Sequence, residues 1–195
     1  STRKESSAAS DVYKRQGVYT LGCEAAEILD AYQGKSADET SEMWLVSGDD
    51  KEDLKRLEEH LRQGKHALWL LPKRQEALSL LDQKIQIKSC GDLFFAAADG
   101  AYGSYPLGML YNAKKDYIDA TADHTIQTEF SGETLIYTYD KSGFQGSKGA
   151  KPHRAFVKKC SAEGGTLILC SLAREGRVGY NIGLYELLLD LLEQE

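Results

Sequence analysis

The chain has 195 residues, and 42% of them are hydrophobic, which is enough for the core of one α/β domain. Its 30 acidic residues outnumber its 24 basic ones, and a net charge of −6 without a basic face argues against nucleic acid as a partner. No apolar run approaches the roughly 18 residues that a membrane span requires, so a membrane partner is not expected either.

Residues 1–16, STRKESSAASDVYKRQ, are polar and lack periodicity, which predicts a disordered tail. Their end, DVYKRQ, resembles an artefactual start of the kind seen in translated metagenomic reads, in which case the chain is a fragment of a longer protein. Residues 17–195 are expected to form a single domain. No signal-peptide core is present, so a cytoplasmic location is expected if the chain is complete. A mature secreted domain would look the same.

The first half of the domain alternates short apolar runs with amphipathic segments. This alternation predicts an α/β fold, with a mostly parallel sheet flanked by helices on both faces and right-handed crossovers. The expected strands are 17–22, 41–48 and 65–71, and the expected helices are 23–32, 49–64 and a shorter one through Ala77, Leu78 and Leu81.

The segment 49–64, DDKEDLKRLEEHLRQG, is the clearest helix of this half. Asp49 is the expected N-cap, with Glu52 three residues later as in a capping box. Gly64 fits the position that follows a helix C-terminus. The expected buried stripe is Leu54, Leu57 and Leu61.

The second half is less regular. Residues 85–100 offer one or two strands, and 133–140 a further strand. The runs 153–159 and 165–172 flank a Gly-containing turn, which predicts a hairpin-like pair. The terminal segment 181–195 predicts a helix that packs on the sheet, because its leucines follow helical spacing: Leu184, Leu187, Leu188, Leu191 and Leu192.

The stretches EMWLVSGDDKEDLKRLEEHLRQGKHALWLLP and RAFVKKCSAEGGTLILCSLAREGRVGYNIGLYELLLDLLEQ carry a family resemblance. Their order of elements resembles the class I glutamine-amidotransferase-like (flavodoxin-like) domain. Such domains occur in the C-terminal part of some family 2 glycoside hydrolases, the β-galactosidase and β-glucuronidase group, and in trehalose-utilisation-type proteins. The resemblance implies the same flanked sheet, ending in a C-terminal strand pair and a terminal helix.

For function, the resemblance implies a non-catalytic accessory domain of a carbohydrate-active enzyme. Its role would be domain packing, oligomerisation or sugar contact. The implied partners are the catalytic domain or subunit of a glycosidase, a second copy of the chain, and carbohydrate. The catalytic carboxylates of such glycosidases lie in a separate barrel domain, which this chain is too short to contain.

The alternative is a stand-alone cysteine-dependent hydrolase or amidotransferase relative. Cys23 is the weak candidate nucleophile, because it follows a strand and opens a helix. At the other strand-to-helix junction, Pro72 and Lys73 stand where a nucleophile could lie. No His-x-Glu motif supplies a base, because none of the histidines, His60, His66, His124 and His153, has Glu two residues later. His60 and His66 are expected at the surface.

The remaining motifs are weaker. Tyr102 and Tyr105 are weak candidates for ligand binding, because exposed aromatic rings stack on sugars and anchor interfaces. The loop GFQGSKGAK, 143–151, fits neither common phosphate-binding pattern. SGDD, 47–50, is explained by helix capping, and no C-x-x-C pair is present. Neither a metal nor a cofactor is therefore expected, and Cys170 is expected in the core.

Overall fold

The computed structural model describes residues 17–31, 36–72, 76–89, 95–97, 124–139, 154–172 and 182–192. The expected tail, Lys73, Cys90, Tyr102, Tyr105 and the 143–151 loop lie outside these residues. The helices are α2 (Cys23–Ala31), α3 (Lys51–Arg62) and α4 (Ile182–Leu192). The strands are β1 (Tyr19–Leu21), β2 (Met43–Ser47), β3 (His66–Leu70), β4 (Leu78–Leu80), β5 (Gln83–Ser89), β6 (Phe95–Ala97), β7 (His124–Thr128), β8 (Gly132–Tyr139), β9 (Ala155–Ala162) and β10 (Gly165–Cys170).

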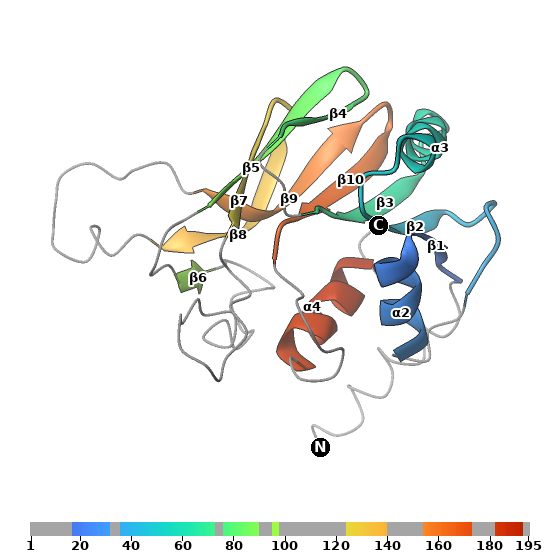
Figure 1. Ribbon diagram of the computed structural model, residues 1–195, viewed down its shortest axis with the longest axis horizontal. Coiled ribbons are helices and arrows are strands. Elements are labelled where there is room, and N and C mark those ends of the chain that lie inside the picture. Colours follow the sequence, from blue (N-terminus) through green and yellow to red (C-terminus); the bar gives the residue numbers. More distant parts are fainter. Residues whose placement is uncertain are drawn as a thin grey trace, which may run out of the picture.

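The described strands form one mixed sheet, whose main path runs β1-β2-β3-β10-β9-β7-β5-β4, with β8 also paired to β9 and β6 to β8. The expected mostly parallel sheet is therefore wrong. Among the described strands, only β1, β2, β3 and β10 form parallel pairs, whereas the other strand pairs are antiparallel. Helices flank the parallel half, and the antiparallel half is curled, so that its β4 edge lies beside α3 (Figure 1).

The parallel half follows the sequence prediction closely. β1 pairs with β2 and β2 with β3, so the strands at Val18, Leu45 and Leu70 are neighbours in the expected order. The expected hairpin is also present, because β9 and β10 are antiparallel partners. The terminal helix packs its leucines on the sheet as expected, with Leu187, Leu188, Leu191 and Leu192 all buried.

Two apolar cores lie on opposite faces of this half. Ala25 and Ile28 of α2 share one core with the leucines of α4, and Leu57 and Leu61 of α3 belong to the other. In Figure 1, α2 and α4 accordingly lie below the sheet and α3 lies on its other side. Cys170 is fully buried, as expected.

The placement of α2 and α3 corrects the expected handedness. Three strands that advance in one direction across a sheet put both connecting helices on one face when both crossovers are right-handed. Here β1, β2 and β3 advance in order, yet α2 and α3 pack on opposite faces. The two crossovers therefore have opposite hands, and the expectation fails for one of them.

Helix α3 begins one residue later than expected. Asp50, rather than Asp49, is the N-cap, and its carboxylate accepts hydrogen bonds from the backbone N–H groups of Glu52 and Asp53. Gly64 has a φ of 79° and follows the C-cap Gln63, as the sequence predicts. No helix among the described residues is long and apolar enough to cross a membrane.

The expected helix through Leu78 and Leu81 is replaced by the β4–β5 hairpin. Its two turn residues, Leu81 and Asp82, have φ values of 50° and 59°, as a two-residue type I′ connection requires. No glycine or asparagine signals this turn, and Glu, Ala and Leu favour a helix in isolation. Leu78 and Leu80 are buried against the α3 core, so tertiary packing outweighs the local preference.

Candidate functional site

A pocket with a volume of about 460 Å³ lies in the antiparallel half of the sheet. Small-molecule sites occupy about 300–1,000 Å³, so its size suits a small ligand. Its walls come from β5, β7, β8, β9 and the residue that precedes β9. The lining residues are Lys88, Thr125, Ile126, Gln127, Thr128, Thr134, Arg154, Ala155 and Lys158.

The strand pattern explains why a pocket forms here. β8 follows β9 from Gly132 to Tyr137, whereas β7 meets β9 at one register pair, Ile126 with Ala155. β8 also has register shifts on either side of Ile136. Irregular pairing of this kind bends strands and re-aims side chains, and it is common beside functional sites. The pocket is therefore lined where β7 and β8 each meet β9.

The charge of the lining is uniform. Three cationic side chains, Lys88, Arg154 and Lys158, line the pocket, and its described lining contains no Asp or Glu. Within the described part of the chain, no carboxylate forms an ion pair with Lys88 or Lys158. Because the whole chain has a net charge of −6, this concentration of positive charge is local. A concave site of one sign concentrates counter-ions.

Hydroxyl groups lie among these cations. Lys88 and Thr125 are directly opposite each other on β5 and β7, and Thr134 and Lys158 are opposite each other on β8 and β9. The Lys158 ammonium donates to the Phe130 carbonyl oxygen at 2.6 Å, which fixes its position and leaves further N–H donors. The Thr125 and Thr128 hydroxyls already donate to the carbonyl oxygens of Lys88 and Lys84, at 3.4 Å and 3.0 Å. The lysine ammonium groups are therefore the donors that can form charge-assisted hydrogen bonds to an anion.

The residues that line the pocket differ in burial. Ile126 and Ala155 are buried, at 7% and 6% exposure. Lys88, Gln127 and Arg154 are exposed, while Lys158 is half-buried. The lining therefore combines buried apolar residues with exposed polar ones, as is usual for a ligand site.

Cys23 lies where the sequence predicts, as the first residue of α2, and its side chain is exposed. Within the described residues, no hydrogen bond or ion pair reaches its thiol. The backbone N–H of Ala25 donates instead to Ser47 Oγ at 3.0 Å, so part of the helix N-terminus is already satisfied. The described residues therefore supply no activating base for Cys23.

The SGDD segment caps helices, as the sequence predicts. Ser47 closes the N-terminus of α2 from the end of β2, and Asp50 closes that of α3. In the described ranges, no group of three or more His, Cys, Asp or Glu side chains could hold a metal ion.

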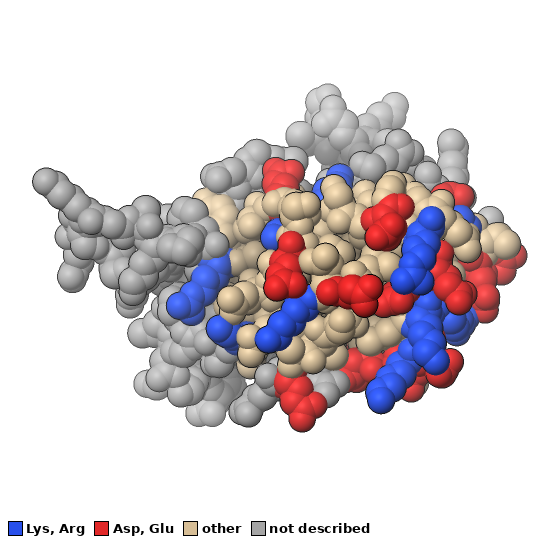
Figure 2. Space-filling model, turned by 90° about the horizontal axis from the view of Figure 1, so that it is seen from above, with Lys and Arg blue, Asp and Glu red and all other residues tan. Residues whose placement is uncertain are grey.

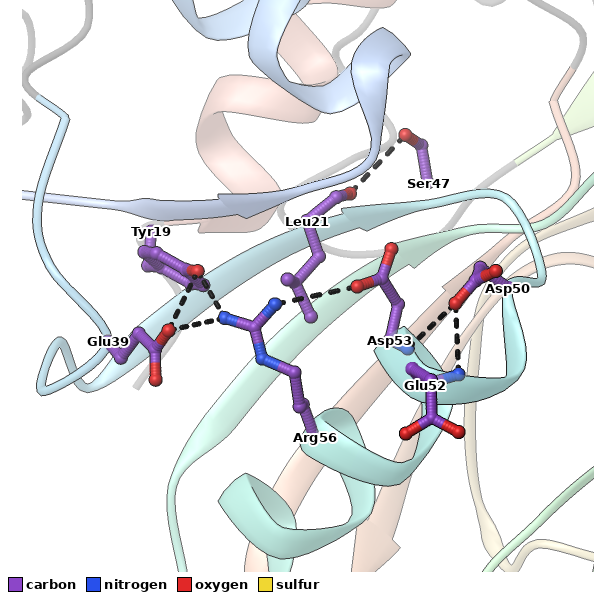
Figure 3. Close-up of polar contacts among 8 residues, drawn as sticks. All are labelled: Tyr19, Leu21, Glu39, Ser47, Asp50, Glu52, Asp53 and Arg56. Carbon is purple, nitrogen blue, oxygen red and sulfur yellow. Dashed lines mark hydrogen bonds and ion pairs between the residues drawn. The ribbon is translucent and has the colours of Figure 1, made fainter.

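A second polar cluster surrounds Arg56 of α3 (Figure 3). Its guanidinium donates to Glu39 at 2.5 Å and to the Tyr19 hydroxyl, and it lies 3.5 Å from an Asp53 carboxylate oxygen. It also lies over the Tyr19 ring, 5.6 Å from the centroid. Because two carboxylates already neutralise Arg56, this cluster joins β1 to α3 rather than presenting a charge to a ligand.

His60 is buried, at 2% exposure, which corrects its expected surface position. Its ring stacks on Trp44 with centroids 4.0 Å apart, and its Nε2 lies 2.9 Å from the His66 carbonyl oxygen. Burial lowers the pKa of the His60 imidazole. His66 is half-buried.

The surface over α3 carries both signs of charge. Figure 2 shows Lys and Arg side chains interspersed with Asp and Glu over the end of the molecule that carries this helix. Lys55 pairs with Glu52, and Arg62 pairs with Glu58, both along the helix. On the face shown in Figure 2, the described residues at this end therefore mix both signs of charge, unlike the pocket lining.

The sequence did not predict the pocket. Lys88 and Lys158 are 70 positions apart in the sequence, and neither belongs to a motif. The available signal was the placement of Lys and Thr among strand residues at 84–88, 125–128 and 154–159. These residues can be recognised as one site only once the pairing of their strands is known. No protein-family model matches the chain, and a search of curated proteins finds no match.

Proposed function

We propose that this chain is a ligand-binding domain whose pocket between β5, β7, β8 and β9 takes a small anionic molecule. The observation that carries the proposal is the lining, in which Lys88, Arg154 and Lys158 occur with three threonines and no described acid. Oxyanions such as carboxylate and phosphate accept the hydrogen bonds that ammonium and guanidinium groups donate.

Titration calorimetry with inorganic phosphate and with acetate, at constant ionic strength, tests this proposal. We expect saturable binding by the wild-type protein and a loss of about tenfold or more in Lys158→Met, equal to about 1.4 kcal/mol. Lys84→Met is the matched control, since Lys84 is an exposed lysine of β5 that does not line the pocket. Equal affinities in the two variants, or no binding of either anion, would overturn the proposal.

The accessory role in a carbohydrate-active enzyme stays a prediction. A binding pocket is compatible with it, because Gln127 and the threonines can also hydrogen-bond sugar hydroxyls. The genomic reading frame upstream of the chain tests it. A continuous frame encoding a barrel domain would support an accessory role, whereas a start codon directly before residue 17 would favour a stand-alone protein.

A further inference from the structure

The lining of the pocket comes from both faces of the sheet, and one face combines a cation with apolar residues. Ile126 and Ala155 belong to the core beneath helix α3, and so does Leu169, which lies directly opposite Lys158. Thr134 is also directly opposite Lys158, on β8. Directly opposite residues of antiparallel strands point to the same side of the sheet. Lys158 and Thr134 therefore lie on the face of Ile126 and Ala155.

An irregularity of β9 brings Ala155 to this face. Neighbouring residues of a strand normally alternate, so residues three positions apart, such as Ala155 and Lys158, would point to opposite faces. The register of β8 against β9 shifts on either side of Ile136, and Phe156 and Val157 both belong to the opposite core. The alternation is therefore interrupted between Phe156 and Val157, as at a β-bulge, and Ala155 shares the face of Lys158.

The other two cations of the lining are placed differently. Lys88 follows Ile87, which belongs to the same core as Ile126, so the Lys88 side chain points to the opposite face of the sheet. Arg154 already has an interaction partner. Among the described lining residues, Lys158 is therefore the lysine that shares a face with Ile126.

Lys158 and Thr134 are the donors that this face offers to a ligand. The Lys158 ammonium donates one hydrogen bond to the Phe130 carbonyl oxygen and keeps its remaining N–H groups. The Thr134 side chain is half-buried, and no hydrogen bond joins its hydroxyl to another described residue. The Thr128 hydroxyl, in contrast, is already bonded to the Lys84 carbonyl oxygen. One ammonium and one adjacent hydroxyl suit the two oxygens of a single carboxylate.

Resting on the proposed function, we infer that the ligand is a small aliphatic monocarboxylate. Its carboxylate binds Lys158 and Thr134, and its apolar chain lies against Ile126 and Ala155, which line the pocket on the same face. A second negative charge on the ligand would lack a second lysine on this face within the described lining. An apolar chain, however, gains affinity from leaving water.

A chain-length series tests the inference. Acetate, propionate and butyrate are compared by titration calorimetry at constant ionic strength. Butyramide is the uncharged counterpart of butyrate, and inorganic phosphate is the anion without a chain. Each methylene group that leaves water contributes about fourfold to affinity. We therefore expect butyrate to bind about tenfold more tightly than acetate, butyramide or phosphate.

Substitutions locate the carboxylate. Lys158→Met should weaken butyrate by about tenfold and Thr134→Val by about threefold, whereas Lys84→Met, outside the lining, should leave its affinity unchanged. Lys88→Met should weaken butyrate less than Lys158→Met does, because Lys88 points to the other face. Thermal melts of each variant verify folding, and Lys158→Gln replaces Lys158→Met if that variant does not fold.

The outcomes separate the inference from the proposed function. If none of the anions binds, both are wrong. If acetate or phosphate binds as tightly as butyrate, the pocket is an anion site and the monocarboxylate inference is wrong. The inference is also wrong if butyramide binds as tightly as butyrate, or if Lys88→Met costs as much affinity as Lys158→Met.

Discussion

The backbone N–H of Leu81 donates a hydrogen bond to Glu58 Oε1 at 2.8 Å, which ties the β4–β5 turn to helix α3. Leu81 is nearly buried and has a left-handed φ of 50°, a conformation that a leucine rarely adopts. The bond therefore supports a turn that lacks the usual glycine or asparagine. Because β4 and β5 belong to the antiparallel half and α3 packs on the parallel half, the bond also links these two halves.

Glu58→Ala should destabilise the protein, because it leaves a buried N–H without its charged acceptor. The expected loss is about 1.5–3 kcal/mol, and less for Glu58→Gln, which keeps a carbonyl oxygen. Urea unfolding measures it. Glu59→Ala on the exposed side of the same helix is the control and should change stability little. Equal effects of the two alanine variants would show that the bond does not support the turn.

Gly22 is required by the close approach of Ser47. A Cβ at Gly22 would lie 2.4 Å from the Ser47 carbonyl oxygen and 2.5 Å from Ser47 Oγ, and its φ is 90°. Gly48 has a similar φ of 83°, but a Cβ there would meet nothing within 4 Å. A side chain at Gly48 would therefore meet only backbone strain, whereas a side chain at Gly22 would meet both backbone strain and a steric conflict.

Gly48→Ala should cost about 1–2 kcal/mol for the left-handed backbone alone. Gly22→Ala should cost about 1–3 kcal/mol more, because the methyl group also displaces the residue that caps α2. Denaturant unfolding of both variants measures the difference. A Gly22→Ala variant as stable as Gly48→Ala would mean that Ser47 can move away freely.

The sequence predicted those elements whose stabilising contacts are local or repetitive. The leucine spacing of 51–62 and 182–192, and the strand runs at 43–47 and 66–70, are visible in short windows. The β4–β5 hairpin was missed because its stability comes from burial against α3 and from Glu58, a residue 23 positions earlier. The curled antiparallel half was missed for the same reason, since strands far apart in sequence pair there.

The candidate site was still less predictable. Cys23 could be placed at a helix start from its neighbours, and its lack of a partner among the histidines could be anticipated. The position of Lys158 opposite Thr134, by contrast, depends on the register of β8 against β9. One residue of slip would move Lys158 to the other face of the sheet, and no short-range pattern determines that register.

The stability of the protein should fall as the pH drops below about 6.5, the usual pKa of histidine. Burial lowers the pKa of His60 in the folded state, and the nearby Lys65 lowers it further, against the opposing effects of the His66 and Glu42 carbonyl groups and the Glu42 charge. The unfolded chain then takes up the proton first, so acidification favours unfolding until the folded-state pKa is reached.

Urea unfolding between pH 5 and pH 7.5 measures this dependence. His60→Gln keeps an N–H donor for the His66 carbonyl oxygen and removes the titration, so its stability should depend less on pH over this range. A wild-type protein more stable at pH 5 than at pH 7.5, with that trend absent in His60→Gln, would reverse the assigned direction.

The cysteines should differ in reactivity according to burial. Cys23 is exposed, whereas Cys160 and Cys170 are buried, and burial raises the pKa of the Cys160 thiol to about 11. Because the thiolate is the reactive form, iodoacetamide should modify Cys23 in the native protein and Cys160 and Cys170 only after unfolding. Peptide mapping by mass spectrometry assigns the labels. Labelling of Cys160 in the native state at the rate seen for Cys23 would contradict its buried position.

Cys23 also allows a test of the alternative function, a cysteine-dependent hydrolase or amidotransferase. Among the described residues no base contacts Cys23, so Cys23→Ala should leave the fold intact and remove no glutaminase or esterase activity. Alkylation alone does not distinguish the alternatives, since an exposed thiol reacts without a catalytic base. Turnover of glutamine or an activated ester by the wild-type protein, lost in Cys23→Ala while the melting temperature is unchanged, would establish Cys23 as a nucleophile. Its base would then have to come from residues 1–16, 32–35 or the other segments outside the described part.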